Sequence, residues 1–253
     1  MTARIDINAD MGESYGRWTL GHDDELMPFL SSANIACGFH GGDPHVMRHS
    51  VRLAKKHGVA VGAHVSFPDL IGFGRRRMQI SPQELKDYVE YQVGALQAFA
   101  AAEGARVEHV KPHGALYVMC TEDEAYAQAV SEAVRELGEG LILLLTGERV
   151  AAAARRAGVP FVMEGYIDLD YDAKGSLILE RAKRARDPED VAARAVTLAT
   201  EGKVPVRDGG WLPLGARSVC VHGDADNAPA IARTVRERLL RAGVEVAPLR
   251  ALL

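Results

Sequence analysis

The sequence predicts an α/β fold: a variant TIM-like (β/α) barrel of about seven parallel strands, formed by a single domain over residues 1–253. Three observations support this prediction. Short apolar segments alternate with helical patterns, and polar residues follow nearly every apolar segment. In an open doubly wound sheet, the alternative fold, the site would concentrate at one crevice. The length also suits a barrel, since such barrels commonly have about 250 residues.

The predicted strands are short and rich in aliphatic residues. We expect them to be apolar on both faces, because parallel strands covered by helices are buried on both sides. A further segment over 244–249 is a candidate extra strand. In chain order the seven principal strands are predicted over 4–10, 33–39, 59–65, 107–113, 141–146, 159–165 and 218–224.

The predicted helices between these strands begin at recognisable capping residues. Asp43 precedes a proline and predicts one helix start, and Gly58 predicts the end of that helix. Capping boxes at 81–84 and 121–124 predict two more starts. The helices predicted on this basis cover 44–57, 81–104, 121–137, 148–157, 188–200 and 228–242.

Composition excludes several classes of protein. A net charge of −4 gives no general attraction for nucleic acid or acidic lipid, so we expect a small-molecule partner. The charged N-terminal segment does not resemble a secretory signal, and no apolar run approaches a membrane span. We therefore expect a cytoplasmic protein. Its three distant cysteines, Cys37, Cys120 and Cys220, are interpreted as buried apolar residues.

Titratable residues gather at the predicted carboxyl ends of the strands, which converge on one face of a parallel barrel. Five of the nine histidines lie there: His40, His45, His64, His113 and His222. The carboxylates at these ends are Asp10, Glu13, Asp43, Asp69, Glu164, Asp168 and Asp224. The other four histidines, His22, His49, His57 and His109, are interpreted as solvated surface residues.

Individual residues leave alternatives open. Asp43 is explained as a helix cap but is also a candidate wall of the site, and His45 is interpreted as peripheral. His40 precedes two glycines that allow close approach of the backbone, which favours a functional role. Lys111 ends an apolar strand; it either binds an anionic substrate or forms a structural ion pair with Asp or Glu.

The segment 72–77 contains three arginines, which either form a solvated charged surface or bind a carboxylate or phosphate. We expect at most one or two of them to face the site, and Arg75 and Arg76 are the candidates. Aspartate and histidine side chains from strand ends could form a zinc or manganese site. However, no zinc-protease motif is present, so no residue is assigned as a metal ligand. A divalent metal is compatible with the sequence but not required by it. No phosphate-binding glycine motif is recognisable either.

Five ordered motifs resemble the LamB/YcsF family of lactam-utilisation proteins. They are DINADMGES (6–14), SANIACGFHGGDP (32–44), VGAHVSFPDLIGFGRR (61–76), VKPHGALY (110–117) and VCVHGD (219–224). The family positions that match are Asn8, Asp10, Glu13, His40, Asp43, His64, Lys111, His113, His222 and Asp224. The chain departs from the family pattern at Leu169, where an arginine is usual, and at Lys174, where an aspartate is usual.

The resemblance implies a barrel akin to that of sugar deacetylases, and an ATP-dependent hydrolase that opens 5-oxoproline to L-glutamate with two partner subunits, B and C. ATP would then be bound through the complex. The resemblance and the residue types suggest that Asp10 or Glu13, with His64, activates water. Lys111 and an arginine of 75–77 would hold the substrate carboxylate and phosphate.

In the same hypothesis Asn8, Asp43 and Asp224 contribute to substrate binding, and His40, His113 and His222 orient these groups or shuttle protons. Two rival functions remain open at this point. One is a stand-alone metal-dependent deacetylase or amidohydrolase, which predicts a tightly bound metal. The other is a non-catalytic ligand-binding subunit, which predicts that alanine at Asp10 and His64 leaves the activity of the complex nearly intact.

Overall fold

Seven parallel strands close into a barrel in a computed structural model that describes residues 3–173, 175, 177–178, 185–223 and 225–253. Each strand pairs with the next, and the last pairs with the first, in the order β1-β2-β3-β4-β5-β6-β11. The predicted TIM-like barrel of about seven strands is therefore confirmed. Its strands are β1 (Arg4–Met11), β2 (Ser32–Ala36), β3 (Ala60–Val65), β4 (Val107–Pro112), β5 (Ile142–Leu145), β6 (Phe161–Tyr166) and β11 (Ser218–Cys220).

Among the described residues, five short strands lie outside the barrel. The predicted extra strand is present as β12 (Glu245–Val246), which pairs with the first residues of β1. Two small antiparallel pairs between β6 and β11 were not predicted, because their strands are only two or three residues long. They are β7 (Asp170–Tyr171) with β8 (Leu177–Ile178), and β9 (Lys203–Pro205) with β10 (Trp211–Pro213).

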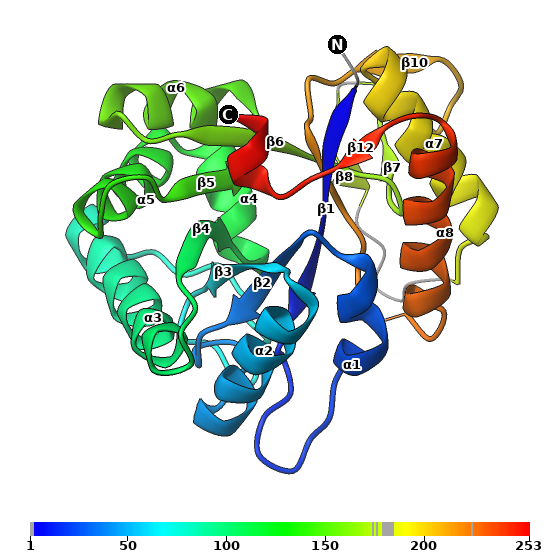
Figure 1. Cartoon of the computed structure of the whole chain (residues 1–253). Helices are drawn as coiled ribbons and strands as arrows, with labels where there is room; N and C mark the ends of the chain where they lie inside the picture. The colour runs from blue at the N-terminus through cyan, green and yellow to red at the C-terminus, as the bar shows by residue number, and fades with distance from the viewer. Residues whose placement is uncertain (1–2, 174, 176, 179–184, 224) are drawn as a thin grey trace.

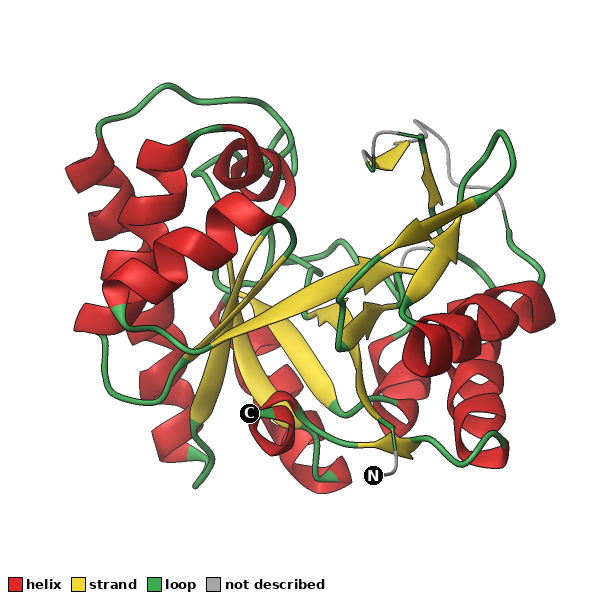
Figure 2. Cartoon of the chain, turned by 90° about the horizontal axis from the view of Figure 1, so that it is seen from above, coloured by secondary structure: helices red, strands yellow, loops and turns green. Residues whose placement is uncertain are grey.

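Helices cover the outside of the barrel (Figures 1 and 2). The α-helices are α1 (Asp23–Leu26), α2 (Pro44–His57), α3 (Pro82–Ala102), α4 (Gly114–Glu122), α5 (Glu124–Glu136), α6 (Glu148–Ala157), α7 (Pro188–Glu201) and α8 (Ala228–Arg241). The described residues also form two 3-10 helices, η1 (Met27–Phe29) and η2 (Leu249–Leu252). No helix among the described residues combines the length and the apolar character needed to cross a membrane.

Two of the predicted helix caps are confirmed, and the third is wrong. Asp43 Oδ1 accepts from the backbone N–H groups of His45 and Val46, and Ser81 Oγ accepts from Glu84 N. The capping box predicted at 121–124 is absent, because α4 already occupies that segment through Glu122. Asp123 is extended there and caps α5 instead, accepting from Ala125 N.

The barrel interior is polar, so the expectation of strands apolar on both faces is wrong for β1. Its residues alternate: Ile5 and Ile7 join the apolar core, whereas Asp6, Asn8 and Asp10 bond to residues of other strands. All of these residues except the partly buried Asp10 are fully buried. Hydrogen bonding across the barrel allows these groups to be buried.

Candidate active site

The centre of the site is a buried lysine shared between two carboxylates. Lys111, at the end of β4, places its Nζ 3.0 Å from Asp10 Oδ1 and 2.9 Å from Glu164 Oε1. The same Nζ donates to Asn8 Oδ1 over 3.2 Å. Only 1% of the Lys111 side chain is exposed. Lys111 was expected either to bind an anionic substrate or to form an ion pair with Asp or Glu, and the structure shows the ion pair.

The charges in this group stabilise one another. Burial lowers the pKa of the Lys111 ammonium, but the neighbouring carboxylates, Asp10 first, raise it to a net value well above the ordinary range. Burial likewise raises the pKa of Asp10, but its interactions with His64 and Lys111 hold that pKa well below the usual value. Asp10 is therefore an ionised carboxylate at neutral pH.

Two asparagines form hydrogen bonds with the carboxylates of Glu164 and Asp10 inside the barrel. Asn8 Nδ2 donates to Glu164 Oε1 and to Ser218 Oγ, each over 2.8 Å. Asn34 Nδ2 donates to Asn8 Oδ1 over 2.8 Å and to Asp10 Oδ1 over 2.9 Å. Asn8, predicted as a substrate-binding residue, thus has both ends of its amide bound to protein groups.

His109 belongs to this network, so its interpretation as a surface residue is wrong. It lies on β4, is fully buried, and its Nε2 is 2.8 Å from Asn34 Oδ1. Burial lowers its pKa to about 3, which keeps the ring neutral. Gly62 on the neighbouring strand makes room for the ring, since a Cβ there would lie 2.0 Å from His109 Nε2.

A second group, the histidine cluster, contains Glu13, His40, His64 and His113, whose ligand atoms all lie within 4.8 Å of one another. His40 Nε2 is 3.0 Å from Glu13 Oε1, and His113 Nδ1 is 3.0 Å from His64 Nε2. His64 Nε2 also lies 3.2 Å from Asp10 Oδ2, which joins the cluster to the lysine pair. Four predicted site residues from distant parts of the chain are thereby brought together.

Burial keeps two imidazoles of the cluster neutral. The pKa values of His40 and His113 lie well below the ordinary value, because both rings are buried and because a second proton in so close a group of imidazoles would be repelled. The two rings stack with centroids 3.8 Å apart. Gly74 lies against them, and a Cβ at this position would come within 2.8 Å of the His113 ring and 3.0 Å of His40 Cβ.

The three arginines of the segment 72–77 have different neighbours. Arg76 forms an ion pair with buried Asp69, and Arg77 forms one with Glu122 at 2.7 Å. The Arg75 guanidinium lies over the Phe73 ring, 5.2 Å from its centroid, and its charge contributes to the lowered pKa of His40. Arg75 is therefore the arginine that lies beside the cluster, and Arg76 holds the loop through Asp69.

The last strand contributes a further pair. His222 Nδ1 is 2.9 Å from both carboxylate oxygens of Asp168, and its backbone N–H donates to Asp168 Oδ2. The His222 ring stacks on Tyr166, with centroids 5.4 Å apart. Asp168 thus orients His222. The residue that follows it is Leu169, at a position where an arginine is usual in the family. Asp224 and Lys174 lie outside the described residues.

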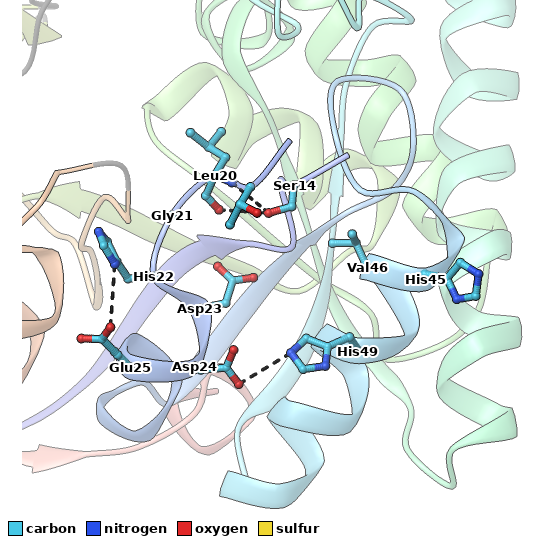
Figure 3. A pocket seen from close by; sticks show the side chains of 11 residues that line it. Ser14, Leu20, Gly21, His22, Asp23, Asp24, Glu25, His45, Val46 and His49 are labelled. Atoms are coloured by element: carbon cyan, nitrogen blue, oxygen red, sulfur yellow. Dashed lines mark hydrogen bonds and ion pairs between the residues drawn. The ribbon is translucent and has the colours of Figure 1, made fainter. Parts of the chain in front are cut away.

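Asp43 and His45 lie apart from these two groups. The second oxygen of the Asp43 carboxylate accepts from Gly16 N over 2.7 Å, so Asp43 fixes the loop after β1 as well as capping α2. His45 is exposed and lines a hollow of about 470 Å³ formed by this loop, α1 and the start of α2 (Figure 3). The hollow shares none of the predicted catalytic residues.

Sequence reasoning assigned no role to several functional neighbours. Glu164 was noted only as a carboxylate near a strand end, and Asn34 and His109 were not considered candidates. An available signal was the alternation of polar and apolar residues in 4–10, which indicates a polar barrel interior. The three cysteines are buried as predicted, and Cys220 Sγ lies 3.4 Å from Lys111 Nζ.

Together these features define a TIM-like (β/α) barrel protein with buried acid, base and cationic groups at the carboxyl ends of its strands. The chain belongs to the LamB/YcsF family, whose model matches residues 5–253. It is 50% identical over 246 residues to the A subunit of the 5-oxoprolinase of Thermus thermophilus, covering 96% of this chain and 98% of that protein.

Two solved structures are similar to this chain. The lactam utilization protein of Thermus thermophilus is 48% identical to this chain and superposes with a TM-score of 0.91. The match covers 97% of this chain and all of that chain. A peptidoglycan N-acetylglucosamine deacetylase, 11% identical, has a TM-score of 0.50 and covers all of this chain and 88% of its own. This second likeness concerns the fold alone.

Proposed function

We propose that this chain is the A subunit of an ATP-dependent 5-oxoprolinase, which opens 5-oxoproline to L-glutamate in a complex with subunits B and C. The identity of 50% with a protein of that name, over nearly the full length of both, supports the proposal. Because the sequence contains no recognisable nucleotide-binding motif, we assign ATP to the complex. Since the proposed reaction uses ATP, we infer that it takes place in the cytoplasm.

The proposed reaction overcomes the resonance of a five-membered lactam. Transfer of a phosphoryl group from ATP to the lactam oxygen makes the ring carbon more electrophilic. Water adds to that carbon and loses a proton to a base, and the ring C–N bond breaks as the nitrogen gains a proton. A second water releases phosphate from the resulting acyl phosphate and leaves L-glutamate.

One observation carries the assignment of residues: Asp10 is held between Lys111 and His64, at 3.0 Å and 3.2 Å. His64 and Lys111 hold the pKa of Asp10 well below its usual value, and 17% of the Asp10 side chain remains exposed. An ionised carboxylate 3.2 Å from a histidine nitrogen can accept a proton from water and pass it on to the imidazole. In this proposal Asp10 and His64 form the acid–base pair, and Glu13 and His113 extend it.

Lys111 and Arg75 then have different roles. Lys111 is surrounded by Asp10, Glu164 and Asn8, so it balances charge inside the barrel and does not reach out to the substrate. Arg75 lies beside the histidine cluster with an exposed side chain. We assign it to the carboxylate or phosphate of the substrate, for which a guanidinium is suited.

The test is glutamate release from 5-oxoproline in the presence of ATP. This chain alone, subunits B and C alone, and all three together are compared. Release only from the full mixture would support an ATP-coupled lactamase assembled from the three subunits. Absence of glutamate from every mixture, with all proteins folded, would contradict the proposal. Assays with acetylated amides would then test the stand-alone amidohydrolase.

A further inference from the structure

Two ring nitrogen atoms of the histidine cluster, His64 Nε2 and His113 Nδ1, lie 3.0 Å apart. His64 Nδ1 lies 3.0 Å from the backbone oxygen of Lys111, and His113 Nε2 lies 2.8 Å from that of Phe73. A carbonyl oxygen can only accept, so His64 Nδ1 and His113 Nε2 carry the hydrogens. With no further proton on either ring, the remaining nitrogens, His64 Nε2 and His113 Nδ1, are both acceptors, 3.0 Å apart.

A third acceptor is aimed at the same place. Glu13 Oε1 lies 3.6 Å from His113 Nδ1, and only 13% of the Glu13 side chain is exposed. A single proton on His64 would satisfy His113 or Asp10, but it would leave the Glu13 oxygen facing the lone pair of His113. One multivalent cation would bind all three acceptors at once, and His40 Nε2 lies beside the same Glu13 oxygen at 3.0 Å.

We propose that Glu13, His64 and His113 bind one divalent transition-metal ion of the zinc type, with His40 as a positioning residue. Around Zn²⁺, nitrogen and oxygen ligands at about 2.0 Å in a tetrahedron are about 3.3 Å apart. The observed separations of 3.0 Å and 3.6 Å lie on either side of this value. Two histidines and one glutamate also leave a coordination position open.

The surroundings of the proposed ligands are those of a metal centre. Each ligand histidine donates its other ring N–H to a backbone oxygen, which fixes the ring orientation. His40 Nε2 is 3.0 Å from Glu13 Oε1 and can hold that carboxylate in place. Lys111 engages Asp10, which leaves Glu13 as the carboxylate that balances the charge of the ion.

Such an ion would supply a Lewis acid beside Asp10, and in that respect the inference rests on the proposed lactam hydrolysis. With the ion bound, His64, His113 and Glu13 would hold it, and Asp10 alone would accept the proton from water. The binding itself does not depend on that function. Binding can therefore be tested on this chain alone, without substrate, ATP or partner subunits.

The experiment removes metal from the full chain with a chelator and then titrates Co²⁺ and Zn²⁺, each alone. Calorimetry gives the stoichiometry and affinity, and the visible absorption of Co²⁺ reports its coordination. We expect one ion per chain. His64→Gln and His113→Gln should each weaken binding by on the order of 100-fold or more, because losing a ligand exceeds the 10- to 100-fold effect of losing an outer partner. Glu13→Gln should weaken it as well.

His49→Gln is the matched control. His49 is exposed, lies near Asp24 in the hollow of Figure 3, and could bind a metal adventitiously. Its replacement should leave the affinity unchanged. Circular dichroism of each metal-free variant checks that it is folded, and Glu13→Gln provides an independent test if a histidine variant does not fold.

Absence of saturable binding, or binding that only His49→Gln weakens, would overturn the proposal. Binding that none of the substitutions changes would overturn it as well. If glutamate is released by protein that binds no ion, the metal site fails and the proposed function stands. If the ion binds to the three predicted ligands but no mixture releases glutamate, the proposed function fails and the site stands.

Discussion

Lys111 Nζ and Glu164 Oε1 lie 2.9 Å apart in the interior of the barrel, and both side chains are almost completely buried. These residues come from β4 and β6, which do not pair with each other. A buried ion pair contributes little net stability, but removal of one partner leaves an uncompensated charge. The ion pair therefore predicts that the barrel loses stability when only one of the two charges is removed.

We expect Lys111→Met to lower the free energy of unfolding by about 3–5 kcal/mol, because Asp10 and Glu164 then remain buried without their cation. The double variant Lys111→Met, Glu164→Gln removes one of these charges and should recover part of the loss. Urea unfolding of both variants measures the difference. Equal stability of Lys111→Met and the natural protein would show that the pair is not coupled as the structure indicates.

Asp10→Asn keeps the shape of the side chain but removes the charge next to His64. If Asp10 is the base of the proposed lactam hydrolysis, glutamate release by the complete complex should fall between about 100-fold and 10,000-fold. His45→Ala, at an exposed position, should have nearly the activity of the natural protein. Activity of Asp10→Asn within a few-fold of that control would favour a non-catalytic role for this chain.

The pH dependence of stability should reflect Asp6. Burial raises its pKa to about 6, although the hydroxyls of Ser218, Ser31 and Ser32 donate to it and lower the pKa. The folded state binds the proton of Asp6 more tightly than the unfolded chain does. Protonation of Asp6 therefore stabilises the folded protein fully below a pH of about 4, and this stabilisation is lost as the pH rises through about 6.

The change amounts to roughly 3 kcal/mol at most, since one pKa unit corresponds to about 1.4 kcal/mol. Asp23, whose burial also raises its pKa to about 6, makes a similar contribution. The comparison with Asp6→Asn isolates Asp6. From pH 4 to pH 7, urea unfolding should show the natural protein losing stability relative to that variant. A relative stability that stays constant or rises with pH would contradict the assignment.

Gly62→Ala should destabilise the barrel by about 1–3 kcal/mol, the usual cost of an overpacked core. The new Cβ would lie 2.0 Å from His109 Nε2 and displace the ring from Asn34. Gly94→Ala is the matched control: Gly94 lies in α3 with no atom within 4 Å of the added Cβ. There the change should raise stability by up to about 1 kcal/mol, because alanine favours the helix. Thermal unfolding of both variants tests the contrast.

The sequence predicted the barrel because strand and helix patterns are local. Aliphatic runs identified all seven barrel strands, and Asp43 and Ser81 marked two helix starts. Prediction failed where a local pattern had two solutions: the residues of 121–124 could begin a helix, but the preceding segment had already formed α4. The small pairs β7–β8 and β9–β10 are too short to leave a periodic pattern.

The amino-acid sequence alone was enough to show which residues lie at the carboxyl ends of the strands, because in a parallel barrel position along a strand fixes the face to which a residue belongs. It could not decide which of these residues meet. The pairing of Lys111 with Glu164, the burial of His109 against Gly62, and the facing nitrogens of His64 and His113 depend on strand register and barrel closure. These are long-range properties, and they are fixed only when the whole barrel has closed.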